Sequence, residues 1–264
     1  MPSRRIAKPV VHGTPIEKDD NLLDRFSSGD RFDYFAKAFF AVEHALVAEK
    51  VATVVPRGTV LNVGCGRHGT ERDLFPKANY AIYGVDTNEE SLRILAKRRI
   101  YEGLAKGSIT SLPVPSASVE LVYLRLVLHH LVAPRNLLGE GLRECFRVLK
   151  PGGMLVLVEP NSWHPVGALM NLAHALRLDL YIHGTNDDVA LSPLMLRRRL
   201  STFASDISTH VVSYTWRRLP ISVQSLCNRI QSRMGRLNEK VPFFGHTLMM
   251  IAVKNQTALL PATR

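Results

Sequence analysis

The chain has 264 residues, of which 46% are apolar, and a formal net charge of +11. A chain of this length can bury about 70–75% of its unfolded surface, so a single large core is available. No stretch approaches about 18 uncharged apolar residues, which argues against a membrane-spanning helix. The positive charge favours acidic partners: nucleic acid, an anionic membrane, or a substrate with phosphate or carboxylate groups.

The cysteine pattern argues against disulfide and metal sites. Cys65, Cys145 and Cys227 have no short paired spacing, so neither a disulfide framework nor a zinc site is expected. The first ten residues are basic but no apolar run follows them, so no signal peptide is predicted. We therefore expect a reduced, cytoplasmic setting.

The N-terminal part divides into an arm and a helical segment. Residues 1–20 combine prolines, a glycine and charges, which predicts a flexible arm. In residues 21–57 the apolar side chains recur at helical spacing, which predicts one or two amphipathic helices ending before Pro56. The residues that show this spacing are Phe35, Phe39, Val42 and Leu46.

Short apolar runs then alternate with helical stretches. Strands are expected at residues 59–63, 81–85, 104–109, 119–124 and 154–158. Helices are expected at residues 89–100 and 137–149. This alternation predicts crossover units and a parallel sheet covered by helices on both faces.

The alternation breaks after Glu159. Residues 160–191 contain prolines, histidines and a predicted helix at 166–178, and we interpret them as a lid inserted after the fifth strand. A further helix is predicted from Ser192-Pro193 to about residue 204. The remaining expected elements are strands at 207–216 and 246–253, a helix at 221–237 and a tail at 255–264. We expect residues 21–254 to form one domain.

The strongest local signal is a loop with three glycines after the first predicted strand. Val63 leads directly into Gly64, Gly66 and Gly69, and glycines let the backbone turn sharply and a ligand approach closely. Asp86 lies twenty residues past Gly66, at the end of the next predicted strand. An acidic side chain there can accept both hydroxyls of a ribose.

The same glycines satisfy the dinucleotide fingerprint, so a nicotinamide-dependent dehydrogenase is an alternative. Such a site needs a full helix after the third glycine, yet only six residues separate Gly69 from Pro76. About fifty residues also precede the first strand, where a dehydrogenase domain usually begins with that strand. A tight turn with no ligand is a second, purely structural alternative.

Five segments together resemble the class I S-adenosylmethionine-dependent methyltransferases, in the branch that acts on small molecules. They are residues 60–66, 83–86, 107–115, 120–131 and 147–161. Each motif alone is modest, but the five in this order are specific, and the last strand at 246–254 matches weakly. With the alternation above, the resemblance implies a doubly wound, Rossmann-like α/β sheet of seven strands, the last one antiparallel.

The resemblance also implies residue roles toward S-adenosylmethionine. Gly64, Cys65 and Gly66 would pass beneath its methionine and ribose parts, with Gly69 completing the loop, and Asp86 and the adjacent Thr87 would hold the ribose. Ser108 and Ile109 would flank the adenine, and Leu124 and Arg125 would approach the methionine end. Arg67 either pairs with the carboxylate of the cofactor or points to solvent.

The sequence departs from the family pattern at three places. Asn62 stands where the family usually has an aspartate, and Ser108 replaces a frequent aspartate that bonds to the adenine amino group. Arg67-His68 is an unusual insert. The changes at Asn62 and Ser108 remove acidic contacts to the cofactor.

In open α/β sheets the ligand lies beyond the carboxyl ends of the strands, so the segments after strands four and five should enclose the acceptor. His129, His130 and Glu159 are the candidates for a general base there. The alternative for the histidines is a packed, hydrogen-bonded turn at a strand end, and the alternative for Glu159 is hydrogen bonding to backbone amides of the loop that follows it. Candidate lining residues are Phe32, Tyr34, Phe35, Trp163, His164, Tyr181 and His183, although core packing would explain each of them as well.

The sequence thus predicts methyl transfer to a small acceptor, with an acidic or phosphorylated one fitting the charge. We expect a monomer or homodimer with no specific nucleic-acid partner and no metal. An RNA methyltransferase would explain the charge, but the strand-four motif lacks the Asn/Asp-Pro-Pro-aromatic signature. A protein methyltransferase or a non-catalytic cofactor-binding protein would also be compatible with these motifs.

Overall fold

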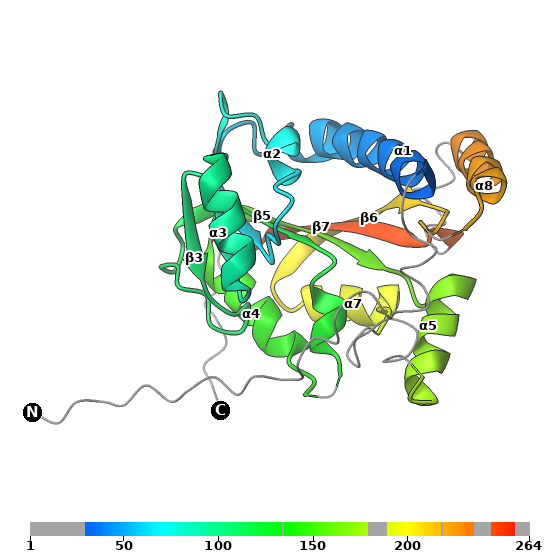
Figure 1. The fold of residues 1–264 in the computed structure, drawn as a ribbon. Helices are drawn as coiled ribbons and strands as arrows, with labels where there is room; N and C mark the ends of the chain where they lie inside the picture. Colours follow the sequence, from blue (N-terminus) through cyan, green and yellow to red (C-terminus); the bar gives the residue numbers. More distant parts are fainter. Residues whose placement is uncertain (1–29, 134, 179–188, 218, 235–243, 257–264) are drawn as a thin grey trace, which may run out of the picture.

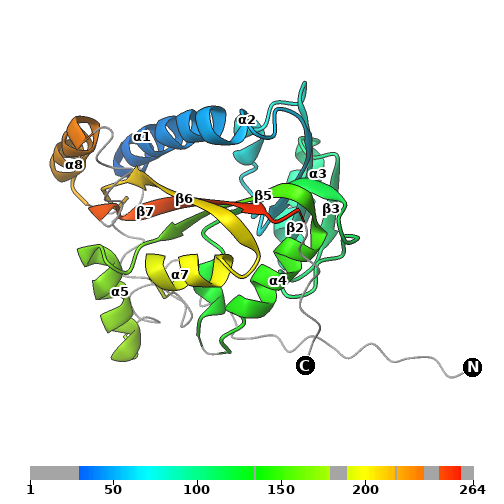
Figure 2. The ribbon, with the colours of Figure 1, turned by 180° about the vertical axis from the view of Figure 1, so that it is seen from behind.

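A mixed seven-stranded sheet with helices on both faces organises the chain (Figures 1 and 2). The computed structural model describes residues 30–133, 135–178, 189–217, 219–234 and 244–256. The sheet has the order β3-β2-β1-β4-β5-β7-β6. Its strands are β1 (Gly58–Val63), β2 (Tyr80–Asp86), β3 (Gly103–Lys106), β4 (Val119–Arg125), β5 (Leu149–Pro160), β6 (Ala204–Ser213) and β7 (Thr247–Lys254).

The helices are α1 (Asp30–Leu46), α2 (Glu71–Leu74), α3 (Glu89–Arg98), α4 (Leu138–Val148), α5 (Pro165–Ala175), α7 (Pro193–Leu200) and α8 (Ile221–Met234). In both views α1, α2 and α8 lie on one face of the sheet, and α4, α5 and α7 lie on the other (Figures 1 and 2). Among the described residues, no helix has the length and apolar character needed to cross a bilayer.

Strand β4 shows that the sheet lies between two apolar layers, one on each face. Successive side chains of a strand point to opposite faces. Leu121 and Tyr123 pack with α1 and α2, whereas Val122 and Leu124 pack with α4 and α7. All four side chains are fully buried, which is why this strand is a continuous apolar run.

The order of the strands reverses at β1. This strand pairs in parallel with β2 on one side and with β4 on the other, so the carboxyl ends of β1 and β4 flank a topological switch point.

β7 is antiparallel to β5, with Pro160 opposite Thr247. The predicted seven-stranded sheet with an antiparallel last strand is therefore confirmed.

The predicted elements are present, with shifted ends. β5 begins at Leu149 rather than 154, because Leu149 pairs with Val119 before a register shift. The helix that follows Ser192 ends at Leu200, because Ala204 already belongs to β6. The predicted arm, most of the tail and residues 179–188 of the expected lid lie outside the described residues.

Candidate active site

The three glycines after β1 all have left-handed backbone conformations. The φ angles of Gly64, Gly66 and Gly69 are +71°, +57° and +67°, in the region that favours glycine. The loop is anchored to β2, since the N–H groups of Gly64 and Cys65 donate to the Val85 carbonyl at 2.7 and 3.2 Å. The turn therefore brings the end of β1 back toward the end of β2.

The glycines differ in what surrounds them. A Cβ atom added to Gly64 would lie 2.4 Å from Cγ2 of Val127, and one added to Gly69 would lie 2.2 Å from Cδ1 of Ile100. A Cβ atom at Gly66 would meet no atom within 4 Å. Gly64 and Gly69 are thus needed for packing, whereas Gly66 borders open space that a ligand can enter.

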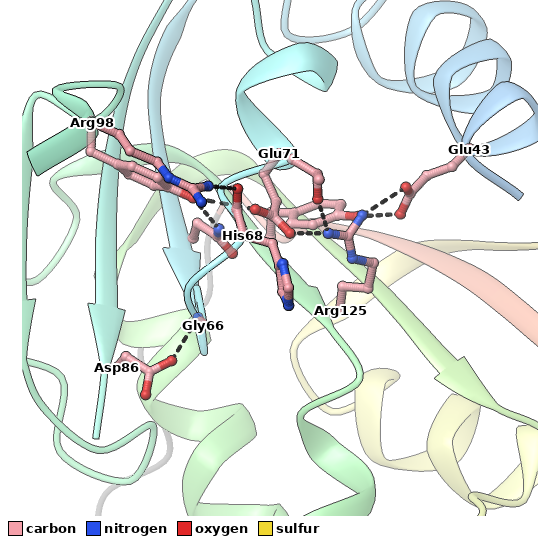
Figure 3. A network of polar contacts seen from close by, with 11 residues as sticks. Glu43, Gly66, His68, Glu71, Asp86, Arg98 and Arg125 are labelled. Atoms are coloured by element: carbon pink, nitrogen blue, oxygen red, sulfur yellow. Dashed lines mark hydrogen bonds and ion pairs between the residues drawn. The ribbon is translucent and has the colours of Figure 1, made fainter. Parts of the chain in front are cut away.

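Asp86 lies beside that open space. Its Oδ2 accepts the Gly66 N–H at 2.7 Å (Figure 3). Its Oδ1 accepts the Asn88 N–H at 2.8 Å. A carboxylate offers about four acceptor positions, so about two remain for hydroxyl groups. The residues present therefore fit a ligand with a ribose next to the glycine loop.

The end of β3 lies next to Asp86. The Gly107 N–H donates to the Asp86 carbonyl at 3.0 Å, which brings Ser108 and Ile109 to this edge of the sheet. The hydroxyls of Ser108 and Thr110 are 2.9 Å apart, and Ile109 is buried. Ser108 and Ile109 thus stand at the position predicted for adenine contacts, which stay a prediction.

Three other predicted cofactor residues differ in exposure. The Cys65 side chain is buried with Leu92 and Leu95, and burial raises the pKa of its thiol to about 12. Cys65 can therefore contact a ligand at the loop only through its backbone. Arg67 and Thr87 are exposed, so their predicted contacts remain open to a ligand.

Arg125, at the end of β4, is held in a polar network. Its guanidinium pairs with Glu43 of α1 at 3.0 Å and with Glu71 of α2, and it also donates to the Thr70 hydroxyl (Figure 3). The Tyr123 hydroxyl donates to the other oxygen of Glu43. Burial raises the pKa of the Glu43 carboxyl, against the lowering effects of Arg125 and Tyr123.

This network changes the interpretation of two predicted cofactor residues. The guanidinium of Arg125 is committed to two carboxylates, so it ties α1 and α2 to the end of β4. The Leu124 side chain is fully buried in the core. The approach of these two residues to the methionine end of a cofactor stays a prediction, and for Leu124 it would involve the backbone.

The partners of Arg125 and Asn62 in this network were not singled out in the sequence. Asn62 donates to the Tyr101 hydroxyl at 2.8 Å, and this hydroxyl lies 3.3 Å from the Glu71 carboxylate. Two hydrogen bonds through the Tyr101 hydroxyl thus link the Glu71 carboxylate to Asn62, the position where the family usually has an aspartate. One signal could have revealed Glu43, since it is a charged residue within the apolar helical pattern of residues 35–46.

A second polar group joins the ends of β4 and β5. Glu159 is 2% exposed, and its Oε1 accepts the N–H groups of Val127 and Leu128 at 2.9 and 2.7 Å. Its Oε2 lies 2.7 Å from Nδ1 of His129. With the Glu159 oxygen as acceptor, this contact requires the proton of the His129 ring on Nδ1.

His130 has a different environment from His129. Its side chain is exposed, whereas His129 is buried, and the two ring centroids are 4.0 Å apart. The three predicted base candidates are thus brought together at the carboxyl edge of the sheet. Glu159 makes the backbone hydrogen bonds that the structural alternative requires, although to the loop after β4 rather than to its own.

The predicted lining residues fall into separate groups. Phe35 packs against the core on α1, Tyr34 and Trp163 are exposed, and the His164 ring accepts the Val166 N–H at the start of α5. The Phe32 side chain, Tyr181 and His183 lie outside the described residues. Phe35 is half-buried against the core, which agrees with the packing alternative.

A doubly wound sheet with a glycine loop at the switch point and an acidic residue at the end of the neighbouring strand β2 is typical of nucleotide-cofactor-binding α/β proteins. Residues 61–157 match the sequence pattern of a family described as "Methyltransferase domain". A protein of Mycolicibacterium smegmatis, named "Probable S-adenosylmethionine-dependent methyltransferase", is 31% identical over 118 residues, 45% of this chain and 44% of that protein. The match to it thus spans less than half of that relative's length.

Further similarities have lower sequence identity, and those to solved structures cover more of the chain. A "Ubiquinone biosynthesis O-methyltransferase" of Caulobacter vibrioides is 26% identical over 134 residues, 49% of this chain and 51% of that protein. A solved structure from Thermotoga maritima, described as a SAM-dependent methyltransferase and possible histamine N-methyltransferase, has a TM-score of 0.57 at 15% identity. It covers 85% of this chain and 97% of its own. A SAM-dependent methyltransferase structure from Archaeoglobus fulgidus has a TM-score of 0.55 at 16% identity, with 88% and 98% covered.

Residues 61–157 are therefore a methyltransferase domain of the class I S-adenosylmethionine-dependent family, and the cofactor of this family is S-adenosylmethionine.

Proposed function

We propose that the chain is a methyltransferase that transfers the methyl group of S-adenosylmethionine to a small acceptor. The observation that carries this proposal is the hydrogen bond between Asp86 and Gly66 beside open space at the switch point. It puts a carboxylate with about two spare acceptor positions next to a backbone that a ligand can approach.

The proposed cofactor site uses mainly backbone and one carboxylate. Gly66 gives close approach, Asp86 accepts the ribose hydroxyls, and Ser108 with Ile109 borders the adenine. When bound, S-adenosylmethionine supplies a methyl group on a sulfonium that is already a good leaving group. The protein then has to align the acceptor with that methyl group and exclude water.

We assign His129 as the general base and Glu159 as the residue that positions it. The Glu159 carboxylate fixes the proton of the neutral ring on Nδ1, so Nε2 is the nitrogen that can take a proton from the acceptor. The proton of an acceptor hydroxyl would move to Nε2 as the bond to the methyl carbon forms and the sulfonium–methyl bond breaks. An ammonium acceptor would give its proton to Nε2 first, so that its nitrogen has a lone pair for the attack. Glu159 also holds the backbone of residues 127–128, which fixes the place of His129.

The acceptor is proposed to be small, and an acidic or phosphorylated compound suits the net charge of +11. The names of the Caulobacter and Thermotoga proteins refer to ubiquinone biosynthesis and histamine, both small-molecule contexts. The residues after β4 are Leu126-Val127-Leu128 and lack the Asn/Asp-Pro-Pro-aromatic signature of exocyclic amine methylation. The lid function of residues 160–191 belongs to the same proposal.

An RNA methyltransferase is the second candidate, and the positive charge is the observation that favours it. The test uses the purified chain, S-adenosylmethionine labelled in its methyl group, and a cell extract separated into small-molecule, RNA and protein fractions. We expect the label in the small-molecule fraction. Label in the RNA fraction would replace the proposal, and no transfer to any fraction would favour a non-catalytic cofactor-binding protein.

A further inference from the structure

Helix α5 follows directly after β5 and exposes apolar side chains where a surface helix normally exposes polar ones. Leu169, Leu172 and Leu176 are 63%, 53% and 59% exposed, and they recur at helical spacing. The residues that α5 buries are the smaller Gly167 and Ala173, together with Met170. The three leucines thus point away from the core, whereas Met170 is the one large apolar side chain that α5 buries.

The orientation of α5 is enforced by its inner face. A Cβ atom at Gly167 would lie 2.0 Å from the Asn161 carbonyl oxygen, so only glycine fits at this contact. Asn171 is bonded through both side-chain atoms to the backbone of Ala190, at 2.8 and 3.1 Å. Because these contacts fix the polar and small residues inward, α5 cannot rotate to bury its leucines.

The apolar surface continues through two aromatic residues. Trp163, before α5, and Phe244, before β7, are 43% and 61% exposed. Asn161 joins their two loops, since its side chain donates to the Gly245 carbonyl at 2.8 Å and accepts the Trp163 N–H at 2.9 Å. The exposed aromatic rings therefore belong to neighbouring loops at the carboxyl edge of the sheet.

Helix α8 also exposes apolar side chains, with arginines beside them. Val223, Leu226 and Ile230 are exposed at helical spacing, and Arg229 and Arg233 are exposed beside them. α5 and α8 lie at the same end of the sheet, one on each face, in both views (Figures 1 and 2). Residues 163–178 and 219–234, which include both helices, contain three arginines and no aspartate or glutamate.

We propose that this end of the molecule, formed by α5, α8, Trp163 and Phe244, docks on a bilayer that contains anionic lipid. Exposed leucines and aromatic rings suit the boundary between headgroups and acyl chains. Arginines without neighbouring acidic residues on the same helices complement anionic headgroups. The surface is at the carboxyl edge of the sheet, so docking brings the candidate site toward the bilayer. Docking does not require catalysis, and it can be tested separately from methyl transfer.

The test is co-sedimentation of the full chain with phosphatidylcholine vesicles, with and without phosphatidylglycerol. We expect binding to the anionic vesicles that weakens with added salt. Leu169→Glu and Leu172→Glu should each weaken binding about tenfold or more, because each replaces a membrane-contacting apolar side chain by a charge. Arg229→Gln with Arg233→Gln should reduce the difference between the two kinds of vesicle.

The matched control is Val54→Glu. Val54 is 55% exposed but precedes β1, at the opposite edge of the sheet, so this variant should bind vesicles like the parent. Melting temperatures of all variants should stay near that of the parent, because the changed side chains are exposed. Equal binding by Leu169→Glu and the parent, or no binding by the parent, would overturn the proposal. A parent dimer that Leu169→Glu converts to a monomer, without vesicle binding, would assign the surface to a second copy of the chain instead.

Discussion

The carboxylate of Glu159 at the end of β5 and the ring of His129 after β4 are 2.7 Å apart, Oε2 to Nδ1, and both side chains are buried. The same carboxylate holds two backbone N–H groups through its other oxygen. Position and protonation of the ring are therefore set by one residue on the neighbouring strand. This arrangement supports the proposed role of His129 as a base that Glu159 orients.

Glu159→Gln tests the arrangement. The new side chain keeps an oxygen for the two backbone N–H groups but turns an N–H toward Nδ1, so the ring has to carry its proton on Nε2. We expect turnover to fall about 100-fold or more, with cofactor affinity nearly unchanged. His129→Gln should show a similar loss. Near-normal turnover in both variants would leave Glu159 structural and move the base to His130.

Gly66→Ala and Gly69→Ala form a matched pair. Both glycines have positive φ angles, +57° and +67°, so the backbone strain of alanine, about 1–2 kcal/mol, is similar in the two variants. Only the surroundings of the added Cβ differ. Gly66→Ala should weaken cofactor binding in calorimetry, whereas Gly69→Ala should lower the melting temperature more strongly, because its Cβ meets Ile100. The reverse result would show that Gly66 does not border the cofactor.

Arg125→Met should destabilise the fold. The substitution leaves Glu43 and Glu71 without the guanidinium that pairs with both, and breaking a buried ion pair on one side costs about 3–5 kcal/mol. Urea unfolding measures the change. Arg93→Met is the control, because Arg93 pairs with Glu89 on the exposed surface of α3 and should matter little. A loss of stability for Arg125→Met no larger than for the control would contradict the conclusion that Arg125 ties α1 and α2 to the end of β4.

The two glutamates also show where sequence reasoning reaches its limit. The strands were predictable because apolar runs are local, and the glycine loop was predictable because Gly64, Gly66 and Gly69 stand close in the chain. Arg125 meets Glu43 and Glu71 across 82 and 54 residues of chain. No spacing in the sequence encodes such a pairing. The candidate base residues were found by position, but the contact between Glu159 and His129 depends on how β4 and β5 lie side by side.

Histidine burial predicts an acid-sensitive fold. Burial lowers the pKa of His246 from its usual 6.5 to about 3, and burial also lowers the pKa of His164. Between pH 6.5 and about pH 3, His246 is protonated in the unfolded chain but not in the folded chain. The free energy of unfolding therefore falls as the pH falls below 6.5. The full slope for one proton is about 1.4 kcal/mol per pH unit. In His246→Gln, unfolding measured from pH 7 to pH 4 should show a shallower slope, and an unchanged slope would contradict this account.

The most direct measurement of the central claim is calorimetric titration of S-adenosylmethionine into the parent chain and Asp86→Ala. A charged acceptor of hydrogen bonds contributes about 1.5–3 kcal/mol, so Asp86→Ala should bind about one to two orders of magnitude more weakly. Asp206→Ala, which removes an exposed aspartate on β6, should bind like the parent. Unchanged affinity in Asp86→Ala would remove Asp86 from the site. A parent chain that binds a nicotinamide dinucleotide tightly and S-adenosylmethionine not at all would contradict the account.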